Sequence, residues 1–428
     1  MRGGKARNVR VASAALLASA LLASALLASA GCRRGGGGGG AGGGGAVVEP
    51  TPDLRVRLGV FMSLTGDTAQ YGISALNGYR MAVEEANATG GAAGRRVELV
   101  VQDTRSDGVE TEVVVERLIR EVRVHALLGE VVSSRSLAGA RVAQREGVPM
   151  LTPSATSPDV TAVGPYVFRS CYTDIFQGAA IAHFATGQLG ARRAAFLVDR
   201  DQRYSVDLAR FIREDFVRHG GEVVAEQEYD AGAADFSVQL AEVGAANPDV
   251  LFIPGYYLEV GLLARQARAI GIDVPLVGGD GWDSPRLYEI GGDAMTGGFY
   301  SSHFSAEDPD PQVQRFVADY RRLFVATPDS FAATAYDAAR IMIAAVARSP
   351  SLERAAVRDA LAATRDFPGV TGSVTFNEER NAVKTIVVVR IGDSGRLSVE
   401  THVSPEEVAP PATPTPSPTP QRRRRRGR

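Results

Sequence analysis

The sequence lacks the short motifs that mark common enzyme and cofactor sites. The first strand expected, residues 55–62, is not followed by the glycine fingerprint of dinucleotide-binding folds. There is also no phosphate-binding P-loop, no His-Glu-x-x-His and no Gly-x-Ser-x-Gly. The five histidines are dispersed without the spacing of metal ligands: His125, His183, His219, His303 and His402. Together these absences argue against an enzyme, a bound cofactor and a metal site.

Basic residues are scarce between the two ends of the chain. Of the 47 Lys and Arg residues in the 428-residue chain, twelve lie in residues 1–45 and 421–428, which contain no acidic residue. The 35 that remain face all 49 acidic residues, so residues 46–420 carry a net charge of −14. A body this acidic argues against nucleic acid as a partner.

The N-terminus has the pattern of an export signal. Four basic residues precede an apolar stretch over residues 11–30, which ends in Ser29-Ala30-Gly31-Cys32. Small residues before a cysteine resemble a bacterial lipoprotein site, with cleavage before Cys32 and acylation of its sulfur. Cleavage after Ala30 and an uncleaved membrane anchor are the alternatives. Each of them places the body outside the cytoplasm.

Cysteine is nearly absent, which limits the sources of stability. With Cys32 lipidated, the folded part has Cys171 alone, so an internal disulfide is excluded and stability must come from core burial. A glycine-rich stretch over residues 33–46 is typical of a flexible tether. Residues 410–420 alternate proline with Thr and Ser, and Arg422–Arg426 follow, a composition typical of a disordered tail or of contact with anionic lipid.

The body alternates short β-branched runs with stretches of helical spacing. Strands are expected over residues 55–62, 97–102, 195–198, 222–225, 250–253 and 274–277. Helices are expected over residues 73–86, 110–121, 137–146, 175–189, 205–219, 259–270, 312–324, 329–347 and 352–364. This order predicts an α/β fold of parallel sheets covered on both faces, and so many units require two lobes. Residues 375–376, 385–391 and 397–402 are expected to add edge strands.

Two hydroxyl clusters follow expected strands, at the edge where open α/β sheets bind ligands. Ser133-Ser134 comes after the apolar run 125–129, and the segment 152–156, Thr-Pro-Ser-Ala-Thr, comes after 148–151. Short hydroxyl side chains and the free N–H groups of a helix N-terminus suit a small carboxylate. An ordinary helix cap at Ser133 and a stiff turn at Ser154 and Thr156 are the alternatives.

A lone acid much later in the chain suits a positive charge. Asp280 stands in Gly278-Gly279-Asp280-Gly281-Trp282 and could supply the opposite half of an amino-acid zwitterion. A simple turn is the alternative for Asp280, and core packing is the alternative for Tyr204, Tyr256 and Tyr257. The sequence therefore predicts a binder of a free amino acid, not an enzyme.

Several motifs in order resemble the leucine/isoleucine/valine-binding protein family, the substrate-binding subunits of ABC transporters. The motifs run from about Arg55 to His402 and include Thr65-Gly66…Ala69-Gln70-Tyr71-Gly72, Pro153–Pro158, Asp199…Tyr204, Gly255-Tyr256, Gln266–Arg268, Gly279–Gly281 and Phe331…Tyr336-Asp337. The resemblance implies a type I periplasmic binding protein, in which two Rossmann-like lobes are joined by three crossovers. Ligand would be trapped between the lobes by hinge closure.

The resemblance also assigns roles to residues. Ser133 and Thr156 would hold the ligand α-carboxylate, and the Ser154 carbonyl and the Asp280 carboxylate would hold the α-ammonium. Tyr204 and Tyr256 would close over the ligand from the second lobe. Tyr71 and Phe331, with Trp282, would line the side-chain pocket, and Ala155 lies within the same ligand-binding segment. Both ligand charges must be paired once water leaves the cleft.

Three departures separate this sequence from its relatives. Arg105 and Val132 stand where some relatives have a disulfide, Asp280 stands where Glu is also used, and Ser154 replaces a smaller residue. These changes keep an amino acid as the expected ligand and weaken the expectation of a branched side chain. An amide, urea or an aromatic acid as ligand, or a ligand-sensing role in signalling, is the alternative.

The expected domain layout has five parts. Residues 1–31 form a signal peptide and 32–53 a tether. Residues 54–173 and 302–385 form the first lobe, and 174–301 and 386–404 the second. Residues 405–428 form a disordered tail rich in proline and arginine. We expect the mature protein to be a monomeric periplasmic lipoprotein, anchored through lipid on Cys32, that delivers an amino acid to a membrane permease.

Overall fold

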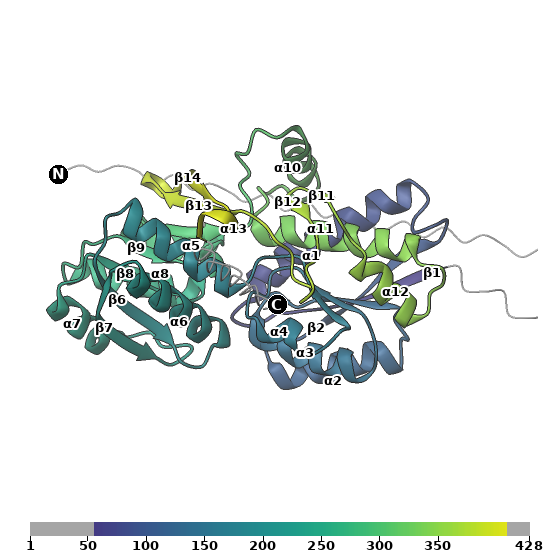
Figure 1. Cartoon of the computed structure of the whole chain (residues 1–428), viewed down its shortest axis with the longest axis horizontal. Coiled ribbons are helices and arrows are strands. Elements are labelled where there is room, and N and C mark those ends of the chain that lie inside the picture. The colour runs from purple at the N-terminus through teal and green to yellow at the C-terminus, as the bar shows by residue number, and fades with distance from the viewer. Residues whose placement is uncertain (1–54, 409–428) are drawn as a thin grey trace, which may run out of the picture. The chain divides into compact units, whose positions relative to one another are not determined.

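The computed structural model describes residues 55–408, which contain two β-sheets with helices packed on both (Figure 1). The expected signal peptide, tether, lipidated Cys32 and arginine run lie outside these residues. Within residues 55–408, no helix is both long enough and apolar enough to cross a membrane.

The first sheet is parallel and has the strand order β2-β1-β3-β4-β5. Its strands are β1 (Arg55–Met62), β2 (Arg96–Asp103), β3 (Ala126–Gly129), β4 (Met150–Thr152) and β5 (Val167–Arg169). The central strands are apolar on both faces because helices cover both. The helices that follow these strands are α1 (Ala69–Ala88), α2 (Gly108–Arg120), α3 (Ser133–Arg145) and α4 (Asp159–Ala162).

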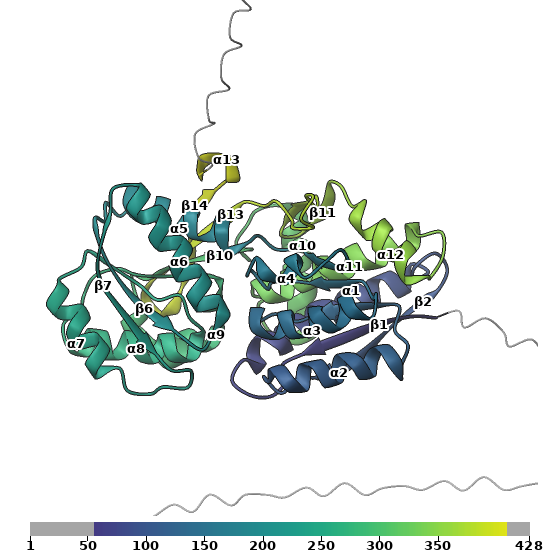
Figure 2. The same ribbon diagram turned by 60° about the horizontal axis from the view of Figure 1, so that its bottom comes forward.

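Three later helices join the first sheet rather than the second. They are α10 (Pro311–Phe324), α11 (Ser330–Arg348) and α12 (Arg354–Ala362). Helix α11 lies against α1 in both views (Figures 1 and 2). Gly78 permits this approach, because a Cβ at this position would lie 2.1 Å from the carbonyl oxygen of Ala332.

The second sheet is mixed and has the strand order β14-β13-β10-β9-β8-β6-β7. Its strands are β6 (Arg193–Asp199), β7 (Glu222–Tyr229), β8 (Val250–Phe252), β9 (Leu276–Gly278), β10 (Phe299–Ser302), β13 (Ile386–Ile391) and β14 (Leu397–Val403). β13 runs antiparallel to β10, and β14 runs antiparallel to β13, so these two strands extend a parallel sheet at one edge.

The helices of the second sheet surround it in Figures 1 and 2. They are α5 (Asp174–Gly187), α6 (Arg203–Arg218), α7 (Ser237–Ala246), α8 (Tyr257–Ala269), α9 (Pro285–Gly291) and α13 (Pro405–Val408). Short 3-10 turns are η1 (Asp280–Trp282), η2 (Gly292–Met295) and η3 (Asp393–Gly395). A small hairpin, β11 (Phe367–Gly369) with β12 (Gly372–Val374), precedes β13.

We call the first sheet with its helices the first lobe and the second sheet with its helices the second lobe. The chain passes between them three times: from β5 to α5, from β10 to α10, and from β12 to β13. This confirms the expected α/β fold of two lobes and three crossovers. The two lobes therefore meet at a hinge made of three chain segments.

The structure differs locally from the expectations. Residues 375–376 are not a strand, since β12 ends at Val374 and Phe376 forms an isolated bridge with Ala382. Helix α7 was not expected, because it buries just Leu240 and Val243 and its apolar spacing is weak.

Candidate functional site

Segments from both lobes meet at the carboxyl ends of the strands and enclose a small cavity. Its volume is about 10 Å³, roughly the space of one water molecule. It is lined by Tyr71, Val131, Val132, Ser133, Ser154, Thr156, Tyr204, Tyr256, Asp280, Gly281 and Phe331. Eight of the nine residues expected to bind ligand are therefore brought together, although they lie up to 260 positions apart.

Of the nine residues expected to bind ligand, Ala155 does not line the cavity. Its side chain is fully buried in the core of the first lobe, between neighbours whose side chains line the cavity. Its carbonyl accepts a hydrogen bond of 2.8 Å from Nη1 of Arg169. Trp282 is likewise buried in the second lobe, where Nε1 donates to the carbonyl of Ile253 at 2.9 Å.

The hydroxyl of Ser133 is arranged as a donor toward the cavity. Ser133 is the first residue of α3, not its cap, and the helix has no capping bond from a side chain. Its Oγ accepts a hydrogen bond of 3.2 Å from the backbone N–H of Ser157. A hydroxyl whose lone pair is occupied still has its proton to donate, and the first N–H groups of a helix have no partner within the helix. This corner of the cavity therefore suits an anion.

A buried ion pair supports the loop that carries Ser133. Glu130 accepts from the backbone N–H of Ser63 at 2.8 Å and of Val132 at 2.7 Å. Nε of Arg135 lies 3.7 Å from Oε2 of Glu130, and Nη2 of Arg135 donates to Oγ1 of Thr68 at 2.6 Å. These bonds hold the turn between β3 and α3 in one conformation.

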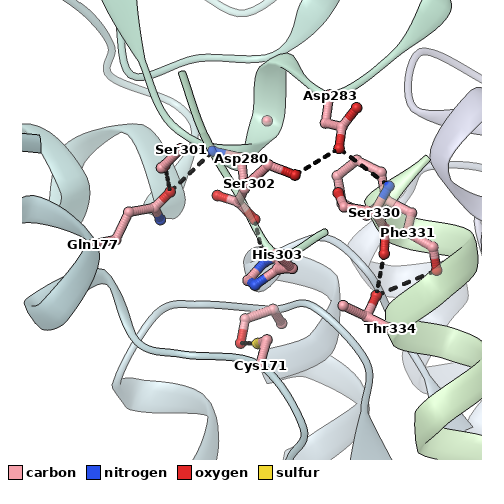
Figure 3. Close-up of polar contacts among 12 residues, drawn as sticks. Cys171, Gln177, Asp280, Asp283, Ser301, Ser302, His303, Ser330, Phe331 and Thr334 are labelled. Atoms are coloured by element: carbon pink, nitrogen blue, oxygen red, sulfur yellow. Dashed lines mark hydrogen bonds and ion pairs between the residues drawn. The ribbon is translucent and has the colours of Figure 1, made fainter. Parts of the chain in front are cut away.

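Within residues 55–408, one of the two carboxylate oxygens of Asp280 has a hydrogen-bond partner (Figure 3). Its Oδ2 lies 3.2 Å from Nε2 of His303, and its backbone N–H donates to Oε1 of Gln177 at 2.9 Å. Its Oδ1 is buried and has no hydrogen-bond partner within residues 55–408. Burial lowers the pKa of His303, although the hydrogen bond to Asp280 opposes this, so a neutral imidazole donates from Nε2. An unpaired buried carboxylate oxygen at a cavity suits a cation.

A second acid, Asp174, contacts the same Gln177 side chain as the backbone of Asp280. The side chain of Asp174 is buried, and its Oδ1 accepts a hydrogen bond of 2.9 Å from Nε2 of Gln177. Burial, with the charge of Asp280, raises the pKa of Asp174 well above its ordinary value. The raised pKa favours the neutral form of Asp174, so this group adds little negative charge at this end of the cavity.

Sequence reasoning missed His303, Gln177 and Asp174. His303 directly follows β10, so the strand-end argument that found Asp280 would have found it had this four-residue strand been expected. Asp174 and Gln177 share the first turn of α5, and no local pattern links them to Asp280 about a hundred positions later.

Aromatic side chains form the remaining walls. Tyr71 packs on Phe331 with ring centroids 4.5 Å apart, and Tyr204 stacks on Tyr256 at 5.2 Å. Burial raises the pKa of Tyr71 and of Tyr204, so both hydroxyls remain protonated. The apolar part of a ligand would therefore meet rings, not charges.

The backbone of Gly281 makes hydrogen bonds to tyrosines of both lobes. The N–H of Gly281 donates to the hydroxyl of Tyr204 at 3.0 Å, and its carbonyl accepts from the hydroxyl of Tyr71 in the other lobe. The same Tyr71 oxygen accepts from the backbone N–H of Tyr257 at 3.2 Å. A Cβ at Gly281 would lie 2.6 Å from the carbonyl of Gly255, so glycine is needed for this close approach.

Two larger cavities lie beside the crossovers and not at the strand ends. One, of about 460 Å³, lies between α9 and the start of α11, and the other, of about 370 Å³, lies beside Lys384. Neither contains a residue predicted to bind the two ligand charges. The small cavity is the better candidate because donors, an unpaired carboxylate oxygen and aromatic walls converge there.

Comparisons with known proteins identify the family. A family model described as "Periplasmic binding protein" matches residues 55–396. The leucine-, isoleucine-, valine-, threonine-, and alanine-binding protein of Pseudomonas aeruginosa is 27% identical over 325 residues, which cover 76% of this chain and 86% of that protein.

Solved structures of similar proteins support the same family. The leucine binding protein LivK from Thermotoga maritima has 36% identity and a TM-score of 0.79, over 82% of this chain and 99% of that one. The branched-chain amino acid transporter substrate binding protein LivJ from Streptococcus pneumoniae, solved in complex with isoleucine, has 31% identity and a TM-score of 0.77, over 82% and 99%. Family membership agrees with the prediction of a binding protein rather than an enzyme. The chain belongs to the periplasmic binding protein family, as its ordered motifs predicted.

Proposed function

We propose that this protein is the extracytoplasmic substrate-binding protein of an ABC transporter, and that it captures a free amino acid for a membrane permease. One observation carries the proposal: the cavity offers hydrogen-bond donors at Ser133 and an unpaired carboxylate oxygen at Asp280. A carboxylate and an ammonium on one small molecule would satisfy both. The solved relatives named above bind leucine or isoleucine, which supports the same ligand class here.

The proposed roles are those that the family resemblance implies, and they are supported by the residues that line the cavity. Ser133 and Thr156 hold the carboxylate, and Asp280 with the carbonyl of Ser154 holds the ammonium. Tyr71, Tyr204, Tyr256 and Phe331 enclose the side chain. A cavity of about 10 Å³ cannot hold an amino acid, so the lobes separate to admit the ligand and close again around it. The lobe boundaries follow the three crossovers.

The test is calorimetric titration with ligands that differ by one charge. L-Leucine is compared with leucinamide, which lacks the carboxylate, and with 4-methylpentanoate, which lacks the ammonium. We expect leucine or another free amino acid to bind at least a hundredfold more tightly than either analogue, because each analogue leaves a buried group unpaired. Equal binding of 4-methylpentanoate and leucine would contradict the proposal and favour an aromatic or other organic acid as ligand.

A further inference from the structure

A second set of contacts joins the lobes outside the cavity. Ser157 follows β4 in the first lobe, and Asp207 lies on α6 of the second lobe. Oγ of Ser157 donates to Oδ2 of Asp207 at 2.8 Å, and the two side chains are 1% and 3% exposed. A buried hydrogen bond to a carboxylate is among the stronger contacts a protein makes.

The partner carboxylate takes part in a network that crosses the cleft a second time. Nε of Arg203 donates to Oδ2 of Asp207 at 2.9 Å, within α6. Nη2 of the same arginine donates to Oδ2 of Asp159 in the first lobe at 2.5 Å. Ser157 and Asp159 of one lobe are thus joined to Asp207 and Arg203 of the other.

Ser157 also contacts the proposed carboxylate site. Its backbone N–H donates to Oγ of Ser133 at 3.2 Å, which leaves the Ser133 proton free for an anion. One residue therefore orients a ligand-binding hydroxyl through its backbone and contacts the opposite lobe through its side chain. Thr156 precedes it in the chain and lines the cavity.

We infer that Ser157 is a positioning residue that couples ligand contact at Ser133 to closure of the lobes against Asp207. The inference rests on the proposed function for the ligand and on the geometry for the closure. When the lobes separate, the contact between Asp207 and Arg203 within α6 remains. The hydrogen bond from Ser157 to Asp207 and the ion pair between Arg203 and Asp159 are broken. These two contacts thus favour the closed arrangement and raise the affinity of every ligand that binds it.

The test uses two variants that leave the cavity intact. Ser157→Ala keeps the N–H bond to Ser133 and removes the bond to Asp207; Asp159→Asn removes the ion pair with Arg203. We expect Ser157→Ala to weaken every ligand by the same factor, roughly tenfold, with a faster dissociation rate. Asp159→Asn should weaken binding less, by about two- to fivefold, and its effect should shrink in high salt.

A matched control and a readout without ligand complete the design. Asp230→Asn removes an exposed ion pair with Arg200 inside the second lobe, 2.6 Å in length, and should leave the affinity unchanged. Small-angle X-ray scattering without ligand should give a larger radius of gyration for Ser157→Ala than for the wild type, because the variant populates the closed arrangement less.

A Ser157→Ala variant whose scattering and ligand affinity both equal those of the wild type would overturn the inference. If no amino acid binds at all, the scattering comparison still decides the closure, so failure of the proposed function is seen separately.

Discussion

At the scale of single residues, we expect Asp280 to select a ligand that carries a positive charge. Replacing it by alanine removes the unpaired Oδ1 of a residue that lines the cavity. We expect Asp280→Ala to weaken binding of the cognate amino acid by about 2–5 kcal/mol, because the ligand ammonium would be buried without a partner. This corresponds to roughly thirty- to several-thousand-fold in the dissociation constant, measured by calorimetry.

The matched ligand for this variant is 4-methylpentanoate, which has no ammonium. Its weak binding should be unchanged or improved in Asp280→Ala, since the variant no longer buries an unpaired carboxylate. An unchanged affinity for the amino acid would remove Asp280 from the site and with it the argument for a zwitterion.

Asp329 is expected to make the stability of the protein depend on pH. It caps α11 by accepting from the N–H of Ala332, and burial with the charge of Asp283 raises its pKa to about 7. Between about pH 4 and pH 7 the folded protein therefore keeps a proton that the unfolded chain has lost. The free energy of unfolding therefore decreases as pH rises from about 4 toward 7.

The variant Asp329→Asn tests this directly. Asparagine retains the capping bond and cannot ionise, so the decline in stability between pH 5 and pH 8 should be shallower in the variant. The difference should be about 1–2 kcal/mol, because partial exposure of the side chain screens the full effect. Urea unfolding across this pH range measures it, and parallel curves for the two proteins would contradict it.

Some residues of the site can be recognised from a local sequence pattern, and others cannot. Ser133 and Asp280 follow predictable strands with glycine or hydroxyl neighbours, so the strand-end rule finds them from sequence. Ser157 and Asp207 are ordinary polar residues of a turn and a helix, and they acquire a role when two lobes meet. Pairings between segments about fifty positions apart leave no periodic signal in one sequence.

At the scale of elements, the packing of α1 on α11 depends on Gly78. A Cβ at this position would lie 2.1 Å from the carbonyl oxygen of Ala332 and 2.9 Å from the backbone N of Tyr336. Gly78→Ala should therefore push the two helices apart and destabilise the protein by about 1–3 kcal/mol, despite alanine's better helix propensity. The apparent unfolding temperature measures the loss.

The control substitution is Gly187→Ala at the end of α5. A Cβ there meets no atom within 4 Å, and the residue is exposed. We expect this variant to be neutral or slightly stabilised, since alanine lowers the entropy of the unfolded chain. Equal destabilisation by both substitutions would show that glycine flexibility, and not the helix contact, matters at Gly78.

Long amphipathic helices and apolar strands were predictable because burial on one or both faces imposes a period on the sequence. The strand expected over residues 55–62 coincides with β1, and the helix expected over residues 312–324 lies within α10. Residues 375–376 were mistaken for a strand because Phe376 is buried by tertiary contacts, not by pairing in a ladder. The antiparallel direction of β13 could not be read from its apolar run, which would suit either orientation.

At the scale of the whole molecule, closure requires contacts that the two lobes make together. The hydroxyl of Tyr71 reaches Gly281, and the hydroxyl of Tyr257 donates to the carbonyl of Asp67 in the other lobe at 2.7 Å. Together with the network at Ser157, these bonds join the two lobes at several points. A ligand has to add enough free energy to these contacts to make the closed state dominant.

We expect the N-terminal segment to determine where this binding takes place, and Cys32 is the residue to test. We propose that the chain is cleaved before Cys32 and anchored by lipid on its sulfur. Acyl chains contribute about 0.8 kcal/mol per buried CH₂, and stable anchoring needs more than one chain or an added basic segment. The run Arg422–Arg426 could add about 1 kcal/mol per arginine at an anionic surface, but this part is screened by salt.

Expression of the full chain in a bacterial host, followed by membrane fractionation, tests the anchor. The wild type should remain with membranes in 1 M salt, and Cys32→Ser should appear in the soluble extracytoplasmic fraction or stay as an uncleaved precursor of higher mass. A variant that lacks residues 421–428 is the control and should remain anchored, because a lipid does not depend on arginine charge. A soluble wild type would indicate cleavage after Ala30 without lipidation. A Cys32→Ser variant of unchanged mass in the membrane fraction would indicate that the apolar stretch over residues 11–30 itself spans the bilayer.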